Sequence, residues 1–542
     1  CNECAVPAIL ILGCILFVIA ANRNHAGILK KIAIVCSAGA VAVTGITVGV
    51  AWNGLDVSNY MKGQSTYSTF IDDNYVDPSS VNITFPEQKR NLIYIFLESM
   101  EMTYADKENG GAFKQNVIPE LTQLAQENED FSGKSNKLNG GYSMPGTTWT
   151  MGAMFGQTSG LPLNISIDGN SMDTQDSFFP GITTLGDILQ NEGYSQTLLI
   201  GSEATFGGRK LYFTDHGQYD IMDYNYAQDN GLIPEDYKVW WGYEDEKLFE
   251  NAKEKLSEIG TKDEPFNFTM LTVDTHFEDG YVCDFCDDEF GDNQYANVMA
   301  CSSRQVKEFI DWVQQQDFAA DTTIVISGDH QTMDSDFCED VDKDYERRVY
   351  TTYINADAEK QTEKKRKYTI FDDFPTTLSA MGAQIEGDRL GLGTNLFSAK
   401  ETLSEKEGVT AEYNKMLKKS KLMEKLSDID EEEYRRKEEE KVSPTADVKI
   451  KKTGKDNQVL IKVENIEHLK KGLQSITAAV WKNEDQSDLQ WVNLAVFENG
   501  ICKTKVDLSN YEPMQGEYNV HIYIIDGKGD AHNVAGTTFE IK

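Results

Sequence analysis

The sequence predicts an α/β protein built on a mostly parallel β-sheet that is sandwiched by helices. Three short, uncharged and largely apolar runs support this prediction: Asn91–Leu97, Phe266–Val273 and Thr322–Ser327. Runs of this kind are typical of strands that are buried on both faces, which is the usual situation in parallel sheets. Each run ends abruptly in polar residues, and helical patterns lie between the runs, so the chain alternates as βαβ units do.

Further elements fill the intervals between these strands. A fourth strand is predicted at Thr197–Ile200, and a short helix that stops at a glycine at Thr184–Gly193. Phe374–Gly382 predicts a helix with proline near its start and glycine after its end. A longer helix is predicted where apolar residues recur at helical spacing, at Val306, Phe309, Ile310 and Val313.

The N-terminal segments predict a membrane anchor. Residues 5–21 and 32–52 carry no charge, and each is close to the length that spans a bilayer. The basic residues between them predict a cytoplasmic loop, so everything after about residue 53 is expected outside the cytoplasm. A cleaved signal peptide is the competing interpretation. Because the chain begins at Cys1 without a methionine, we expect further spans to precede it.

The 542 residues divide into five predicted parts. These are a membrane anchor at 1–52, a polar stalk at 53–90, a catalytic domain at 91–398, a charged helical linker at 399–443 and a β-sandwich at 444–542. The sandwich is predicted from five short alternating runs that are separated by turns. The formal charge of −37 makes nucleic acid an unsuitable partner.

Polar side chains gather where the predicted parallel strands end. Glu98, His276, Asp329 and His330 follow three different strands. Ligands of open α/β sheets bind beyond the carboxyl ends of the strands, so we expect these four residues to form one site. A mixed set of oxygen and nitrogen ligands without thiolate suits Mn²⁺, or alternatively Mg²⁺, better than structural zinc.

A glycine-rich stretch, residues 140–163, supplies candidate nucleophiles. Gly140, Gly141 and Gly146 allow the backbone to approach a ligand closely, and threonines follow at 147, 148 and 150. We predict Thr147 as a metal ligand and nucleophile that attacks a phosphate at the start of the following apolar helix. The simpler alternative is that Thr147 only caps that helix. Arg209 is predicted to clamp phosphate oxygens, and His276 to protonate the leaving oxygen or to hold the phosphate.

Six motifs together resemble the sulfatase-fold phosphoglycerol transferases, which comprise the lipoteichoic acid synthases and the periplasmic-glucan phosphoglycerol transferases. They are Asn91–Ser99, Pro145–Met154, Gly160–Pro162, Val273–His276, Ser327–His330 and Arg389–Ser398. The resemblance implies an alkaline-phosphatase/sulfatase-like fold and metal ligands at Glu98, Thr147, Asp329 and His330. It places the nucleophile at Thr147, which the spacing to Gly160 favours over Thr148, and substrate contacts at Arg209 and His276.

The resemblance also implies an activity. The chain is expected to move glycerol phosphate from phosphatidylglycerol to a glycan or a polyglycerol-phosphate acceptor through a threonine-linked intermediate. A metal-dependent phosphodiesterase, phosphatase or sulfatase-like hydrolase is one alternative, and a non-catalytic cell-surface scaffold is another. The formylglycine motif of true sulfatases is missing from the Thr147 loop, which disfavours sulfate ester hydrolysis.

One departure from the family pattern concerns the glycerol pocket. Synthases that resemble this chain carry a tryptophan two residues before the arginine, where this chain has Gly207. The pocket is therefore expected to be more open, or to be shaped by Phe206 or Tyr212.

Residues beyond 444 resemble the Bsp-like repeat of Gram-positive surface proteins. This implies a Gram-positive cell, an extracytoplasmic enzyme on the cell membrane and an accessory domain that contacts the cell wall. Four cysteines of the predicted enzyme domain remain to be assigned. The exported location favours disulfides, although a zinc site is the alternative, and the sequence does not decide the pairing of Cys283, Cys286, Cys301 and Cys338.

Overall fold

The computed structural model describes residues 66–429, residue 434 and residues 444–541, apart from short gaps at 454, 456, 470–471, 484, 497–500 and 530. The described residues form two compact units, one ending at Ile429 and one containing the residues from 444 onward. The predicted spans at 5–21 and 32–52 lie outside the described residues. Within the described part of the chain, no helix has both the length and the apolar character needed to cross a membrane.

The first unit is organised around a seven-stranded sheet in the order β3-β8-β7-β2-β6-β4-β5. Five neighbouring strands of this sheet are parallel, while β8 runs antiparallel to β7 and β3 antiparallel to β8. This confirms the predicted mostly parallel sheet. Its strands are β2 (Asn91–Leu97), β3 (Gly140–Gly141), β4 (Ser195–Ile200), β5 (Asp220–Met222), β6 (Phe266–Leu271), β7 (Thr322–Gly328) and β8 (Val349–Ile354).

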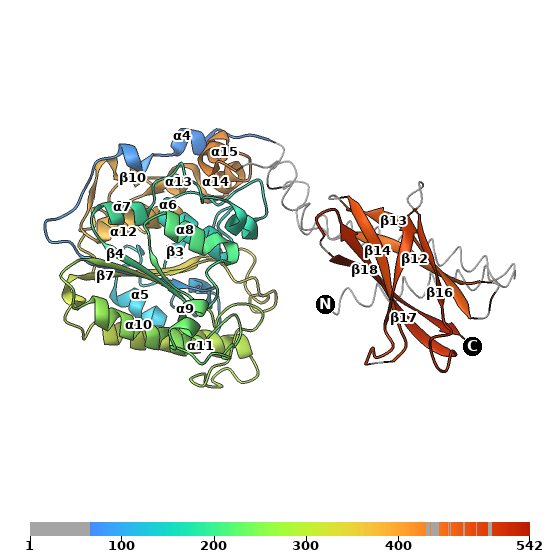
Figure 1. Cartoon of the computed structure of the whole chain (residues 1–542). Helices are drawn as coiled ribbons and strands as arrows, with labels where there is room; N and C mark the ends of the chain where they lie inside the picture. Colours follow the sequence, from blue (N-terminus) through green and yellow to red (C-terminus); the bar gives the residue numbers. More distant parts are fainter. Residues whose placement is uncertain are drawn as a thin grey trace, which may run out of the picture. The chain divides into compact units, whose positions relative to one another are not determined.

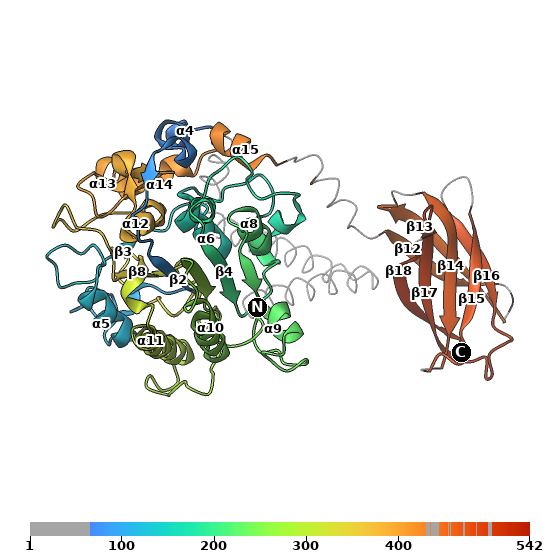
Figure 2. The same cartoon turned by 60° about the vertical axis from the view of Figure 1, so that its left-hand side comes forward.

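Helices cover both faces of this sheet (Figures 1 and 2). One face carries α5 (Pro119–Glu127), α10 (Asp245–Ile259) and α11 (Gln294–Val313). The other carries α6 (Thr150–Ser159), α7 (Leu185–Asn191), α8 (Arg209–Asp215) and α12 (Asp373–Ala380). The central strand β2 serves both layers: Ile93 and Ile95 belong to the core under α10 and α11, while the Tyr94 hydroxyl donates a hydrogen bond to Gln157 Oε1 of α6, at 2.8 Å.

The same glutamine fixes α6 beside the ends of the strands. Gln157 is fully buried, and its Nε2 donates to the carbonyl of Gly328, the last residue of β7, at 3.0 Å. Because β7 leads directly into Asp329 and His330, this hydrogen bond ties the helix to the strand that carries two of the predicted ligands. The first turn of α6 is thereby held over the site.

Two segments differ from the predicted domain borders. Residues 66–90, expected to belong to a stalk, pack on the first unit: β1 (Ile83–Thr84) pairs with β9 (Gln384–Ile385), and Phe70 and Ile71 of α4 (Phe70–Asn74) are buried. Residues 399–429, expected to be a linker, form α13 (Leu403–Glu407), α14 (Val409–Met416) and α15 (Lys421–Ser427). The last two helices pack against α4, so the first and last described segments of this unit contact each other.

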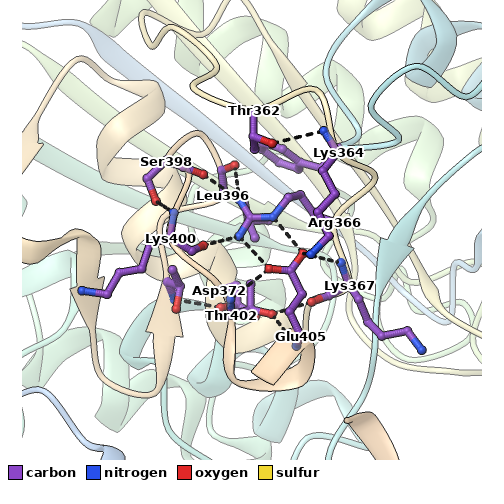
Figure 3. Close-up of polar contacts among 12 residues, drawn as sticks. Thr362, Lys364, Arg366, Lys367, Asp372, Leu396, Ser398, Lys400, Thr402 and Glu405 are labelled. Carbon is purple, nitrogen blue, oxygen red and sulfur yellow. Dashed lines mark hydrogen bonds and ion pairs between the residues drawn. The ribbon is translucent and has the colours of Figure 1, made fainter. Parts of the chain in front are cut away.

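A buried ion pair attaches α13 to the unit (Figure 3). Arg366 donates to both carboxylate oxygens of Glu405, at 3.1 and 3.2 Å, and also to the carbonyls of Leu396, Ser398 and Lys400. Only 3% of either side chain is exposed. Burial by itself raises the pKa of Glu405, but the hydrogen bonds and charge of Arg366, together with hydrogen bonds from the Thr402 and Lys367 amides, outweigh it and lower the pKa.

The second unit is a small antiparallel β domain, and its strands form one continuous sheet where a β-sandwich was predicted. Its sheet order is β12-β13-β16-β15-β14-β17-β18, and β12 and β18 approach each other, so that the sheet is nearly closed. Two of its strands, β15 and β16, were not predicted from the sequence. The strands are β12 (Thr445–Lys452), β13 (Gln458–Glu467), β14 (Leu473–Trp481), β15 (Gln490–Val496), β16 (Cys502–Asp507), β17 (Gly516–Asp526) and β18 (Ala531–Ile541).

We predict that Glu405→Gln lowers the free energy of unfolding of the first unit by about 3 kcal/mol, because it leaves the buried Arg366 cation without its counter-charge. Calorimetric or denaturant unfolding measures this change. Lys364→Gln is the matched control: Lys364 approaches the same carboxylate at 3.6 Å but is 57% exposed, so its loss should cost less than about 1 kcal/mol. Equal effects of the two substitutions would contradict the assignment.

Candidate active site

The parallel register of the sheet brings the predicted ligands together. Leu97 of β2 lies opposite Gly328 of β7, so Glu98 and Asp329 leave adjacent strands side by side. Glu98, Asp329 and His330 are all buried, and one ligand atom from each lies within 4.8 Å of the others. The structure therefore unites three of the four predicted metal ligands.

Hydrogen bonds orient these three side chains. Asp329 Oδ1 accepts from the backbone amides of Ser99, at 2.8 Å, and His330, at 2.6 Å. The His330 Nδ1–H donates to the Gln331 carbonyl at 2.8 Å, which directs Nε2 at the two carboxylates, 3.4 Å from Glu98 and 3.5 Å from Asp329. Asp329 Oδ2 and His330 Nε2 are buried and have no hydrogen-bond partner among the described residues.

The buried negative charge of the two carboxylates in this cluster favours the binding of a cation. Burial and the charge of Glu98 raise the pKa of Asp329. Burial disfavours a charged imidazole, yet the two carboxylates outweigh this and raise the pKa of His330. For Glu98, burial raises the pKa, but His330 outweighs it and lowers the pKa. A proton on His330 thus partly balances the carboxylates, and a divalent cation facing the free atoms Oδ2 and Nε2 balances them more completely.

Thr147 does not reach this cluster. Its hydroxyl donates to the Met144 carbonyl at 2.9 Å and accepts from the Met144 amide at 2.8 Å, which closes a turn before α6. The side chain is fully buried, and its methyl group lies beside Gly156, in the middle of that helix. The prediction of Thr147 as ligand and nucleophile is therefore not supported by its position, and its role in the structure is to close the turn.

Thr150 occupies the position that was predicted for Thr147. It is the first residue of α6, and its hydroxyl donates to Glu98 Oε2 at 3.1 Å. The sequence analysis expected the Thr147 hydroxyl at the start of the apolar helix that follows the three threonines. In the structure, Gly146 adopts a φ of +81° and the chain makes one more turn, so α6 begins three residues later with Trp149 as N-cap. Thr150 followed by a run of small and apolar residues was a helix-start signal that could have identified it.

A cavity of about 280 Å³ opens beside Thr150 at the carboxyl ends of β4 and β6. Glu98, Thr150, Arg209 and His276 all line it. Arg209 begins α8, and its guanidinium donates to the Glu203 carbonyl at 2.8 Å, while Nε has no hydrogen-bond partner among the described residues. Burial lowers the pKa of Arg209 to about 10, against the opposing effect of nearby carboxylates, so it stays a cation at neutral pH.

His276 lines the same cavity. Its Nδ1–H donates to the Phe277 carbonyl at 2.6 Å, and Nε2 forms no hydrogen bond to another described residue. The ring also contacts Trp241, with the ring centroids 5.1 Å apart. Arg209 and His276 are thus brought to the same cavity as Thr150, as their predicted joint role requires.

The walls of the cavity differ from the predicted glycerol pocket. Phe206 lines it as expected, but Tyr212 is buried and its hydroxyl lies 2.6 Å from that of Thr158. A side chain at Gly207 would contact Met151 and the Trp149 ring, and Gly207 itself adopts a φ of +68°. Trp241, which the sequence analysis missed, supplies a further aromatic wall.

Residues 90–383, more than half of the chain, match the sulfatase family. The chain belongs to this family. Residues 448–539 match the GBS Bsp-like repeat, which agrees with the second unit. Both resemblances that the sequence suggested are therefore confirmed at the level of the family.

This sulfatase-family chain also resembles named relatives. It is 31% identical to phosphoglycerol transferase I of Escherichia coli over 337 residues, which cover 61% of this chain and 41% of the relative. The chain therefore spans less than half the length of that relative. Two solved structures also match part of this chain, both at 17% identity and a TM-score of 0.46. One is an alkaline phosphatase superfamily protein from Vibrio parahaemolyticus (81% of this chain, 88% of that one), and the other is the lipoteichoic acid synthase LtaP from Listeria monocytogenes (61% and 81%).

We predict that Asp329→Asn abolishes metal binding in this sulfatase-family site without destabilising the metal-free protein. The amide keeps the shape of the side chain but removes one of two adjacent buried charges. Thermal unfolding with a chelator should show a Tm equal to or above that of the wild type, and added Mn²⁺ should raise the Tm of the wild type only.

Asp130→Asn is the control for this prediction. Asp130 is also a buried carboxylate that accepts backbone amides, from Ser132 and Asn139, but it lies outside the cation cluster. Its variant should keep the full response to Mn²⁺. A response to Mn²⁺ in Asp329→Asn that matches the wild type would show that the metal binds elsewhere.

Proposed function

We propose that this protein transfers glycerol phosphate from phosphatidylglycerol to a glycan or a polyglycerol-phosphate acceptor, with Thr150 as the nucleophile. The observation that carries the proposal is the position of the Thr150 hydroxyl. It lies 3.1 Å from a buried carboxylate of the cation cluster, and it opens onto a cavity that also contains an arginine and a histidine. A nucleophile, a cation site and phosphate-binding groups are the set that phosphoryl transfer requires.

Glu98, Asp329 and His330 are the residues that would hold a divalent cation, for which Mn²⁺ is our first choice and Mg²⁺ the second. Such a cation supplies positive charge beside the phosphoryl oxygens and lowers the pKa of a neighbouring hydroxyl. Glu98 accepts the hydrogen bond of Thr150, which aims the hydroxyl oxygen and weakens its hold on the proton. The first turn of α6 adds backbone N–H groups on the side where negative charge develops.

The reaction proceeds in two displacements. In the first, the Thr150 hydroxyl passes its proton to Glu98 and its oxygen bonds to phosphorus while the bond from phosphorus to the diacylglycerol oxygen breaks, and Arg209 holds the non-bridging oxygens. The departing oxygen takes a proton from His276, which lines the same cavity. In the second displacement, an acceptor hydroxyl gives its proton to His276 as its oxygen attacks phosphorus. The bond from phosphorus to the Thr150 oxygen breaks, and Thr150 regains its proton from Glu98.

The size and rim of the cavity fit a lipid donor. About 280 Å³ accommodates a small polar head group but not two acyl chains, which must remain outside. Phe206 and Trp241 line the cavity and are 57% and 50% exposed, so they offer apolar surface where the head group meets the rest of the lipid. This supports a membrane lipid as donor.

The cellular setting follows from the remaining predictions. An anchor at residues 1–52 would place the enzyme on the outer face of the cell membrane, where phosphatidylglycerol is accessible. The second unit would contact the cell wall of a Gram-positive bacterium, as its Bsp-like match suggests.

The function is tested by incubating the full chain with Mn²⁺ and phosphatidylglycerol that is labelled in the head-group glycerol. We expect diacylglycerol to be released and the label to appear on candidate glycans in an acceptor-dependent way. Release of free glycerol phosphate at a rate that is independent of any acceptor would identify a hydrolase, and no consumption of the lipid would refute the proposal.

We predict that Thr150→Ala lowers turnover by roughly 10⁴-fold or more, because the nucleophile is lost. Without an acceptor, the wild-type chain should gain one glycerol phosphate, which peptide mass mapping should place at residue 150.

The neighbouring threonines are internal controls for this assignment. Thr148→Ala, at an exposed position, should keep both turnover and the adduct. Thr147→Val should lower the free energy of unfolding by about 1–3 kcal/mol, since it removes two buried hydrogen bonds, while the adduct still forms. An adduct that maps to Thr147 would restore the original prediction.

We further predict that Arg209→Ala lowers kcat/KM by about 10²-fold or more, the scale of removing a well-placed charged donor. Arg209→Lys should recover part of the loss, because it keeps the charge but not the forked geometry. The Tm of both variants should stay close to that of the wild type. A large fall in Tm with normal turnover would instead assign Arg209 to the stability of the fold.

A further inference from the structure

Three cysteines converge on the loop that follows β6. Cys283 and Cys286 lie in this loop, and Cys301 lies in α11, the helix that comes next. Cys283 Sγ is 3.7 Å from Cys286 Sγ and 3.7 Å from Cys301 Sγ, and all three sulfurs lie within 4.8 Å of one another. None of the five cysteines that the structure describes forms a disulfide.

A buried amide donor faces two of the three sulfurs. Gln305 Nε2 lies 3.4 Å from Cys301 Sγ and 3.7 Å from Cys283 Sγ, and this glutamine is buried. An N–H group directed at sulfur stabilises a thiolate that binds a metal.

The number of sulfurs argues against a disulfide as the purpose of the cluster. One disulfide would leave an odd thiol in contact with it. Cys338, the fourth cysteine that the structure describes in this unit, does not belong to this group of sulfurs and packs against the hydrophobic core. The expectation that the four cysteines form disulfides is therefore not supported by the arrangement.

We propose that Cys283, Cys286 and Cys301 bind one zinc ion through their three sulfurs, with water or an external ligand in the fourth position. Thiolates select zinc among the common divalent metals, and tetrahedral zinc sites with a pair of ligands spaced Cys-x-x-Cys are common. The site would be separate from the cluster at Glu98, whose ligand atoms are oxygen and nitrogen. The same unit would therefore have two metal sites that select different metals through their ligand atoms.

The loop itself supplies a reason for such a site. Residues 272–293 contain no helix or strand, and Val282 and Phe285, next to the cysteines, are 48% and 58% exposed. Apolar burial therefore contributes little to ordering this segment, and long irregular loops are uncommon without another constraint. A metal bound to both the loop and α11 would supply it. Because the loop begins with Asp274–His276, the zinc would also restrain the histidine of the proposed active site.

The test uses the full chain purified without reductant or chelator. We expect close to one zinc per chain by elemental analysis. After exchange with Co²⁺, a sulfur-to-cobalt charge-transfer band should appear in the near ultraviolet, which the oxygen and nitrogen ligands at Glu98 cannot produce. Cys286→Ser and Cys301→Ser should each lose the zinc and the band. Cys338→Ser and Asp329→Asn are the matched controls and should keep both.

Two results would overturn the proposal. One is a wild-type chain without zinc or the band, whose intact mass is two hydrogens below that of the reduced form, as a disulfide requires. The other is a band that persists in the Cys286→Ser, Cys301→Ser double variant. If either variant fails to fold, the zinc content and the cobalt band of the wild type decide the question alone. The readouts do not depend on turnover, so the proposed transferase function stands or falls separately.

Discussion

The site depends on an energetically unfavourable arrangement. Two buried carboxylates, Glu98 and Asp329, lie close together at the ends of adjacent parallel strands. Two like charges in a low-dielectric interior repel strongly, and burial penalises each of them. The pairing of Leu97 with Gly328 enforces their proximity, because the hydrogen-bond register of β2 and β7 leaves no freedom at that edge. Such an arrangement is useful to a protein only where a cation compensates for it.

The neighbouring structure maintains this arrangement. Backbone amides of Ser99 and His330 satisfy one oxygen of Asp329, and the His330 ring is fixed through the Gln331 carbonyl. Tyr94 and Gln157 connect the central strand, α6 and the end of β7, so the helix that carries Thr150 is positioned by the same strands that carry the acids. Thr150 and the three candidate metal ligands are therefore held by the same strands and helix and not by a mobile loop.

A different set of potential metal ligands, the cysteine sulfurs, lies in the loop that follows β6. β6 leads into His276 and then into a loop that is poor in buried apolar residues but contains Cys283 and Cys286. Sulfur ligands here and oxygen and nitrogen ligands at Glu98 would recruit different metals from the same environment. Parallel sheets place their functional groups on such loops, which leaves each loop free to acquire its own means of stabilisation.

The sequence by itself determined the architecture and most of the site. Apolar runs such as Asn91–Leu97 can be satisfied only by burial on both faces, so the parallel sheet followed from them, and with it the meeting of Glu98, Asp329 and His330 at its edge. The choice between Thr147 and Thr150 needed the tertiary structure, because three threonines in four residues have the same local propensities. The turn at Gly146 decides which one emerges beside Glu98. The same holds for Trp241 and for the three clustered cysteines: their partners are remote in sequence, and only the folded chain brings them together.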